Sequence, residues 1–217
     1  IGGSLLDRLP EITSDTLVVL ELSSFQLEHL DWLHYSPPYA VVLNLVPNHL
    51  DRHGTMEDYQ RAKEVILAHQ TPADTAVLNW DDPVVRSMAR RGQGQRLYYS
   101  VQEELAEGVS RHGTALVLST AGHNTVLCQQ SDLRLRGAHN FGNAAAAAAV
   151  ATTLGVTPDT IAQGLQRFHA LPHRLELVAA KGGVEYYNDS KATTPVSTIR
   201  ALQAFEVALG VEEIARA

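Results

Sequence analysis

Small polar clusters follow four apolar runs of the chain, and they hold the residues best suited to chemistry. In chain order the clusters are Glu21, Ser23 and Ser24; Asn48, His49 and Asp51; Asn79, Asp81 and Asp82; and Asn188, Asp189 and Lys191. In an open α/β sheet, ligands bind outside the carboxyl ends of parallel strands, so we expect the clusters to converge on one crevice. The second and fourth also carry His or Lys, which suits a metal ion and a charged, phosphate-bearing substrate.

Glu21, His49 and Lys63 each have a structural interpretation beside the functional one. Glu21 directly follows the apolar run TLVVL. A carboxylate at the end of a buried strand is strongly destabilising unless it is paired or ligated, but Glu21 can instead cap the helix that SSFQ begins. His49 lies in a polar loop, where a single histidine is more often a surface residue. Lys63 lies on the partly apolar face of the next helix, where lysines also snorkel toward water.

Several classes of protein are disfavoured by composition and by missing motifs. The formal net charge of −7 argues against a general nucleic-acid surface, and the 45% apolar share can build a sizeable core. Cys128 is the only cysteine, so an internal disulfide is excluded and a reducing cytoplasm fits. No apolar run approaches the roughly 18 residues of a spanning helix. GxSxG, HExxH and the phosphate-cradling G-x-x-x-x-G-K-[ST] loop are also absent from the sequence. We therefore expect a cytoplasmic protein that binds neither nucleic acid nor membrane.

The first hundred residues alternate between strand and helix patterns, which predicts parallel βαβ units. After strands at residues 17–20 and 39–45, the stretch MEDYQRAKEVILAHQ has helical spacing. A strand at 74–79 precedes a helix opened by Asp82-Pro83.

From about residue 97 to 136 the pattern changes to short β runs separated by turns, which predicts an antiparallel meander. These runs are RLYYSV, TALVLST, NTVLCQQ and LRLRG. Asn140 is then a plausible N-cap for an Ala-rich helix that Gly155 ends, and Thr157-Pro158 starts another. A strand at 184–187 and a helix at 196–205 follow. The fold class is thus α/β, with a mostly parallel sheet flanked by helices and a small antiparallel meander.

Four longer stretches, in this order and at these intervals, resemble the central domain of the Mur ligases. They are ELSSFQLE, NLVPNHLDRHGTMEDYQRAK, LRGAHNFGNAAAAAA and LPHRLELVAAKGGVEYYNDSKATT. The resemblance covers nearly the whole chain, to about Phe205. SSFQLE and the NDSKAT context are most similar to the D-glutamate-adding branch of that family.

The resemblance implies ATP-dependent amide-bond synthesis in peptidoglycan assembly, with UDP-N-acetylmuramoyl-L-alanine and D-glutamate as substrates. In that family, ATP phosphorylates the carboxylate of the muramoyl substrate, the amine attacks the acyl phosphate, and phosphate leaves. A carboxylate and a triphosphate repel one another, so Mg²⁺ and Lys or Arg must lie between them. We expect ATP and Mg²⁺ as cofactors and a monomeric enzyme.

The resemblance also implies roles for individual residues. Glu21 and His49 match Mg²⁺ ligands, and Lys63 matches a lysine that the family carries as a carbamate, an anion able to face the metal. Lys63, Lys191 and His49 are the implied catalytic residues. The remaining matches are Asn140 and Asn143 near the adenine, Arg174 at the phosphates, Asp189 at the ribose, Ser23 and Gln26 at the muramoyl peptide, and Lys191 and Thr193 at the incoming amino acid and reacting carboxylate. His173 remains open between a structural and a functional role.

We expect residues 1–205 to form the central ATPase domain, with the β insertion at about 97–136, and residues 206–217 to be a remnant of a third domain. Complete members of the family also have an amino-terminal uridine-binding domain and a phosphate loop, and this sequence starts after both. We therefore expect the chain alone to be inactive, because it lacks the lysine and backbone amides that hold the β- and γ-phosphates.

Two other interpretations remain open. The chain could belong to a ligase for another amino acid or to a folylpolyglutamate synthetase, which share the ATP site. It could also be a non-catalytic remnant that serves as a binding module, although a remnant has no reason to keep dispersed polar groups.

Overall fold

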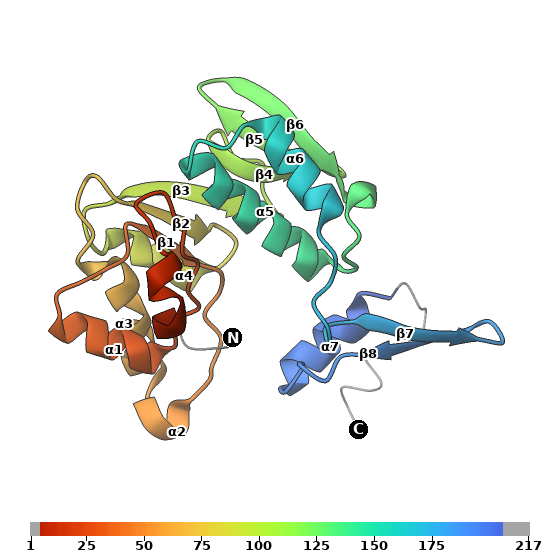
Figure 1. Ribbon diagram of the computed structural model, residues 1–217, viewed down its shortest axis with the longest axis horizontal. Helices are drawn as coiled ribbons and strands as arrows, with labels where there is room; N and C mark the ends of the chain where they lie inside the picture. The colour runs from red at the N-terminus through yellow and green to blue at the C-terminus, as the bar shows by residue number, and fades with distance from the viewer. Residues whose placement is uncertain (1–4, 206–217) are drawn as a thin grey trace.

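Residues 5–205, described by a computed structural model, form a mixed six-stranded sheet covered by helices and a separate two-stranded sheet (Figure 1). The strands of the first sheet lie side by side in chain order: β1 (Tyr39–Val42), β2 (Thr75–Asn79), β3 (Gln95–Ser100), β4 (Gly108–His112), β5 (Ala115–Thr120) and β6 (His123–Gln129). Pairing is parallel from β1 to β4 and antiparallel from β4 to β6. The second sheet is the antiparallel hairpin of β7 (Glu176–Lys181) and β8 (Val184–Asn188). The predicted α/β class is confirmed.

Most of the predicted helices are present at the expected places. The α-helices are α1 (Ser24–Trp32), α2 (Leu50–His53), α3 (Met56–Ala68), α4 (Pro83–Ser87), α5 (Ala138–Thr153), α6 (Pro158–Arg167) and α7 (Pro195–Gln203). Short 3-10 helices are η1 (Leu5–Glu11), η2 (Met88–Arg90) and η3 (Gln130–Asp132). As predicted, Pro83 and Pro158 occupy first turns, and Asp82 and Thr157 are the N-caps before them. No helix in the described part of the chain is long and apolar enough to cross a membrane.

The core has two layers because both faces of the parallel strands are buried. In β2, Ala76 and Leu78 pack with residues of α3 and α4, whereas Val77 packs with residues of α5 and α6. Successive strand residues point to opposite faces, so covering both faces requires a continuous apolar run, as in TAVLN. Alanines at the sheet-facing positions of α5, including Ala145 and Ala149, allow that helix to lie close to the strands.

The predicted N-cap at Asn140 is wrong. Helix α5 starts after Gly137, whose φ of 92° is accessible to glycine, and the Gly137 carbonyl accepts hydrogen bonds from the Asn140 and Phe141 amides. Asn140 is therefore inside the first turn. At the other end, Gly155 follows the helix with φ 75°, as predicted.

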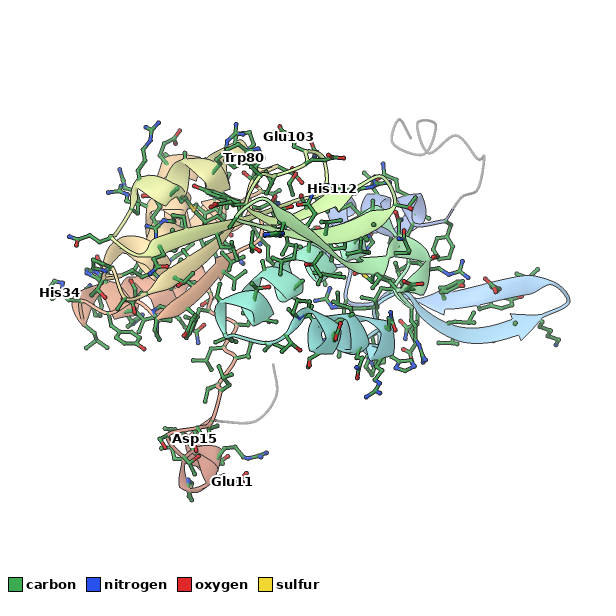
Figure 2. The ribbon with its side chains drawn as sticks, turned by 90° about the horizontal axis from the view of Figure 1, so that it is seen from above. Glu11, Asp15, His34, Trp80, Glu103 and His112 are labelled. Carbon is green, nitrogen blue, oxygen red and sulfur yellow. The ribbon has the colours of Figure 1, made fainter. Side chains whose placement is uncertain are left out.

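The predicted strand at residues 17–20 is also wrong. These residues form no strand, and their apolar side chains are exposed, with Val19 at 94%. The apolar pattern suits a strand, but within residues 5–205 no neighbouring strand pairs with this segment. Figure 2 shows the preceding segment, with Glu11 and Asp15, projecting away from the sheet.

The antiparallel part of the main sheet starts later than predicted. The run RLYYS is β3, which pairs in parallel with β2 and β4, and the run LRLRG is not a strand. Strand β4, which the sequence did not suggest, supplies the edge on which the β5–β6 hairpin pairs. The final run, VEYYN, is β8 of the separate hairpin and not a strand of the main sheet. Residues 206–217 lie outside the described residues, so the expectation of a remnant there remains untested.

Candidate functional site

The first group of predicted site residues lies around the start of α1. Ser23 is the N-cap, and it forms a capping box with Gln26: the Gln26 amide donates to Ser23 Oγ at 3.2 Å and the Ser23 amide donates to Gln26 Oε1 at 2.9 Å. Both residues therefore have a structural role, and their contact with a muramoyl peptide stays a prediction. Glu21 lies two residues before the cap and is exposed, so the expected burial of this carboxylate is wrong.

His49 lies beside this helix in the loop that precedes α2. Its φ of 53° places the backbone in the left-handed region, and its ring meets the Phe25 ring edge-on at 5.4 Å. Arg52 lies over the same Phe25 ring, 5.4 Å from its centroid. One aromatic ring of α1 therefore anchors the loop that carries the predicted imidazole ligand.

Lys63 reaches the same place from α3. Its Nζ donates to the Leu22 carbonyl at 3.4 Å and lies 6.0 Å from the centre of the Tyr59 ring. Burial lowers the pKa of the Lys63 ammonium, and the nearby Glu21 carboxylate opposes this shift. Side chains 42 positions apart in the sequence thus interact electrostatically.

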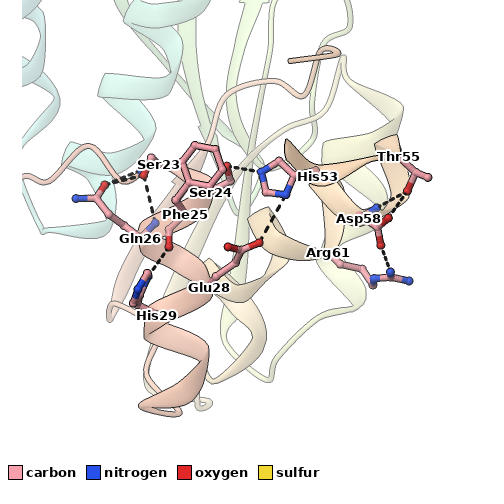
Figure 3. A network of polar contacts seen from close by, with 10 residues as sticks. All are labelled: Ser23, Ser24, Phe25, Gln26, Glu28, His29, His53, Thr55, Asp58 and Arg61. Carbon is pink, nitrogen blue, oxygen red and sulfur yellow. Dashed lines mark hydrogen bonds and ion pairs between the residues drawn. The ribbon is translucent and has the colours of Figure 1, made fainter. Parts of the chain in front are cut away.

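A partly buried polar network that the sequence did not suggest joins α1 to α2 (Figure 3). Ser24 Oγ is 2.9 Å from His53 Nε2, and His53 Nδ1 is 3.6 Å from Glu28 Oε1. Both residues lie in stretches that the sequence analysis singled out, SSFQLE and HLDRH, but nothing in the sequence indicates that Ser24 contacts His53.

Glu21, His49 and Lys63 fit a magnesium ion only with help from other groups. Mg²⁺ prefers oxygen and is usually held by one or two carboxylates, waters and substrate phosphates. Among residues 5–205 no group of three or more His, Cys, Asp or Glu side chains could hold a metal. Glu21 would supply the carboxylate and His49 an imidazole, and the amine of Lys63 becomes a suitable oxygen donor only as a carbamate.

The third polar cluster is structural. Asp82 accepts hydrogen bonds from the Val84 amide at 2.9 Å and from the Leu45 amide at 2.9 Å. Asp81 accepts from the Val101 amide at 2.7 Å, and Asn79 donates to the Leu43 carbonyl at 2.8 Å. These side chains cap α4 and tie neighbouring strands together, so the prediction that this cluster joins the crevice is not supported.

A second group of predicted site residues lies at the start of α5. Asn140 Nδ2 donates to the Arg136 carbonyl at 2.7 Å, and Asn143 Nδ2 donates to Asn140 Oδ1 at 3.2 Å. Asn143 is exposed and Asn140 is half-buried. The two amides are therefore arranged side by side on one face of the first turns.

The hairpin carries the rest of this group. Asp189 Oδ1 accepts from the Leu175 amide at 3.1 Å, next to Arg174, and the Lys191 amide donates to the His173 carbonyl at 3.1 Å. Arg174, Lys191 and Thr193 have exposed side chains. His173 has a structural role, because its Nδ1 lies 2.8 Å from Asn188 Nδ2 at the end of β8.

His139 links the two parts of the second group. It is half-buried, and its pKa is lowered by burial and by the charge of Arg200, while Asp189 raises it. His139 of α5 therefore lies near Arg200 of α7 and near Asp189 at the end of β8, so Asn140 and Asp189 belong to one neighbourhood.

The two groups are separate from one another. Within residues 5–205 no hydrogen bond or ion pair joins Glu21, His49 or Lys63 to the second group, and Figure 1 shows α1–α3 and the hairpin with α7 on different sides of α5. The predicted convergence of all clusters is therefore seen only within each group.

Comparison with known proteins places the chain in a family. The family model of the Mur ligase middle domain matches residues 4–151. The chain belongs to the Mur ligase family. This confirms the family prediction from the sequence.

Among relatives of this Mur ligase chain, the UDP-N-acetylmuramoylalanine–D-glutamate ligase of Pelotomaculum thermopropionicum is 43% identical over 205 residues. The ligase of the same name from Roseiflexus sp. is 44% identical over 211 residues. Each match covers 94% of this chain and 45% of the relative, so the chain spans less than half the length of these relatives.

Solved structures support the fold. A crystal structure of MurF from Acinetobacter baumannii matches with a TM-score of 0.63 at 22% identity, covering 83% of this chain and 39% of that one. A pseudomurein peptide ligase type C from Methanothermus fervidus matches with a TM-score of 0.60 at 22% identity, covering 79% of this chain and 42% of that one.

Proposed function

We propose that this chain supplies the magnesium, nucleotide and carbamate-lysine part of an ATP-dependent ligase that adds D-glutamate to UDP-N-acetylmuramoyl-L-alanine. Relatives with that name and 43–44% identity support the choice of substrates. The structural observation that carries the proposal is the approach of Lys63, on α3, to Glu21 and Leu22 at the start of α1.

The proposed reaction has two transfers. The γ-phosphoryl group of ATP moves to a carboxylate oxygen of the muramoyl substrate, and ADP leaves. The D-glutamate nitrogen then attacks the carbonyl carbon, the C–O bond to phosphate breaks, and the nitrogen loses a proton. Magnesium, when bound, would offset the negative charge between carboxylate and phosphates, so the chain's own task is mainly positioning.

Lys63 suits carbamate formation. Its neutral amine would attack CO₂, forming an N–C bond and releasing a proton, which leaves a carbamate anion. Only the unprotonated amine reacts, and burial lowers the pKa of Lys63, so the reactive fraction is larger than for an exposed lysine.

On the nucleotide side, exposed cations would meet the phosphates. Arg174 and Lys191 have exposed side chains, and the carboxylate of Asp189 accepts a hydrogen bond from the amide of Leu175, the residue after Arg174. Asn140 and Asn143 would face the base through their amide groups, with Thr193 and Lys191 next to the reacting carboxylate.

Carbamate formation can be tested on the chain itself. In ¹³C-bicarbonate we expect a carbamate NMR signal that is lost in Lys63→Met and kept in Lys181→Met, where an exposed lysine of β7 is removed as control. A signal that survives in Lys63→Met would contradict the assignment.

Ligase function is best tested in a chimera in which this chain replaces the matching 205 residues of the Pelotomaculum ligase. We expect phosphate release that requires D-glutamate and is lost in Glu21→Ala or Asp189→Ala. Release with another amino acid instead would favour a different ligase, and a folded chimera without any release would favour a binding module. The chain alone is expected to release no phosphate above background from ATP, UDP-N-acetylmuramoyl-L-alanine and D-glutamate.

A further inference from the structure

His53 is a buried polar residue that none of the proposed catalytic steps uses. Its side chain is only 3% exposed, although it belongs to the short surface helix α2. Ser24, its partner at 2.9 Å, is 2% exposed. A hydrogen bond between two buried groups is strongly directional, and either group left alone would be destabilising.

The ring of His53 contacts both neighbouring helices. On one side it stacks on Phe25 of α1 with a centroid distance of 5.2 Å and an interplanar angle of 4°. On the other side it lies 5.2 Å from the ring of Tyr59 on α3. Figure 3 shows the imidazole pointing from its own loop toward Ser24 and Glu28 of α1.

Each of the three joined segments carries one predicted magnesium ligand. Glu21 lies three residues before Ser24, and the His53 amide donates to the His49 carbonyl at 3.0 Å. Lys63 lies one turn after Tyr59 on α3. The contacts of the His53 ring therefore set where the loop with His49 lies relative to the segments that carry Glu21 and Lys63.

A serine, a histidine and a glutamate in this order of contacts also resemble a hydrolytic triad. Ser24 cannot act as a nucleophile, because it is buried at the first turn of α1 and packed against the imidazole. The network is therefore better suited to hold positions than to attack a substrate.

We infer that His53 is a positioning residue that fixes the loop carrying His49 against α1 and α3, and so assembles the magnesium site. The inference rests on the proposed function for its metal, but the placement of the loop can be measured without metal. The loop depends on such a contact because α2 has only four residues and His49, at its N-cap, makes no side-chain capping hydrogen bond.

Hydrogen exchange of the metal-free chain tests the placement of the loop. In His53→Ala we expect the amides of Arg52 and Gly54, which donate to carbonyls within the loop, to exchange on the order of tenfold faster. The matched control is His69→Ala, which removes another histidine that contacts α1, through Asp31 at 2.8 Å at the opposite end of the helix. Unchanged exchange in His53→Ala, or an equal increase in His69→Ala, would overturn the inference.

Binding of Mn²⁺ alone, followed by electron paramagnetic resonance, tests the consequence for the metal. We expect affinity to fall about tenfold or more in His53→Ala, because the loop that carries His49 loses its side-chain contacts with α1 and α3, and to stay unchanged in His69→Ala. Ser24→Ala keeps the ring stack but breaks the hydrogen bond, so it should give a smaller loss. His53→Gln keeps a polar group toward Ser24 and should recover part of the affinity.

Glu21→Gln separates the inference from the proposed function. If Glu21→Gln loses Mn²⁺ affinity and His53→Ala does not, the metal site stands and the positioning role is wrong. If the unaltered chain, Glu21→Gln and His53→Ala all bind Mn²⁺ equally, the proposed metal site is wrong. Hydrogen exchange alone then decides whether His53 holds the loop.

Discussion

The two groups of predicted site residues are held in place by different kinds of contact. Around α1 the contacts are buried: Ser24, His53 and the rings of Phe25 and Tyr59 fill the space between three segments. Around the hairpin the main clamp is Arg136, which is half-exposed and lies over the rings of Tyr187 and Phe205 at 5.5 and 5.7 Å. Buried contacts hold one geometry, whereas exposed contacts open at low cost. We therefore expect the group of residues around α1 to be more rigid than the group around the hairpin.

A comparison of two leucines should give the largest difference between the regions. Leu67 of α3 is fully buried, whereas Leu177 of β7 is 50% exposed. We expect Leu67→Ala to lower the free energy of unfolding by about 2–5 kcal/mol, because it leaves a cavity, and Leu177→Ala to change it by less than about 0.5 kcal/mol. Urea denaturation of both variants measures this, and similar losses would show that the hairpin is as firmly packed as the core.

Removing the clamp should loosen the hairpin and nothing else. Arg136→Ala removes two cation–π contacts of about 0.5–1 kcal/mol each and a surface ion pair with Glu185 at 3.8 Å that adds little. We expect faster hydrogen exchange in β7 and β8 with α3 unchanged. The control is Arg111→Ala, whose guanidinium lies over the ring of Phe141, a buried residue of α5. Equal effects of the two variants would refute a specific clamp.

The smallest effect is expected from pH. Burial and Arg200 lower the pKa of His139 below its usual 6.5, so the unfolded chain binds this proton first as pH falls. Protonation of His139 therefore does not affect the free energy of unfolding at high pH. As pH drops below about 6.5, it lowers the free energy of unfolding until the pH passes the pKa of the folded state. The difference in unfolding free energy between the unaltered chain and His139→Gln, measured at pH 7.5 and 5.5, isolates this contribution. A difference that does not vary between the two values would contradict it.

The sequence predicted those elements whose local pattern agrees with their final environment. Helix α3 has an apolar face and a capping Thr55, and β2 is apolar throughout because both of its faces are covered. Residues 17–20 have the same apolar character, yet form no strand, because a strand also needs a partner that no local pattern specifies. Strand β4 escaped prediction for the opposite reason: GVSRH is mixed in polarity, and its pairing with β5 defines it.

The candidate site was predictable as a list of residues and not as an arrangement. Motifs pointed to Glu21, His49 and Lys63, and the structure brings Lys63 toward Glu21. The pairing of Ser24 with His53 spans 29 positions and follows from how α2 lies against α1, which the sequence does not encode locally. The cluster of Asp81 and Asp82 was expected to converge on the crevice because a polar cluster after a strand looks the same in sequence whether it serves a site or caps a helix.

The left-handed backbone at His49 has a consequence for directed evolution. A residue with a side chain is disfavoured at φ 53° by about 1 kcal/mol, whereas glycine is not. A library screened only for foldedness would therefore drift toward glycine at this position, and one screened for metal capture would retain the imidazole. Deep sequencing of the two screens would measure these opposing selections as the frequencies of glycine and histidine at the codon of His49.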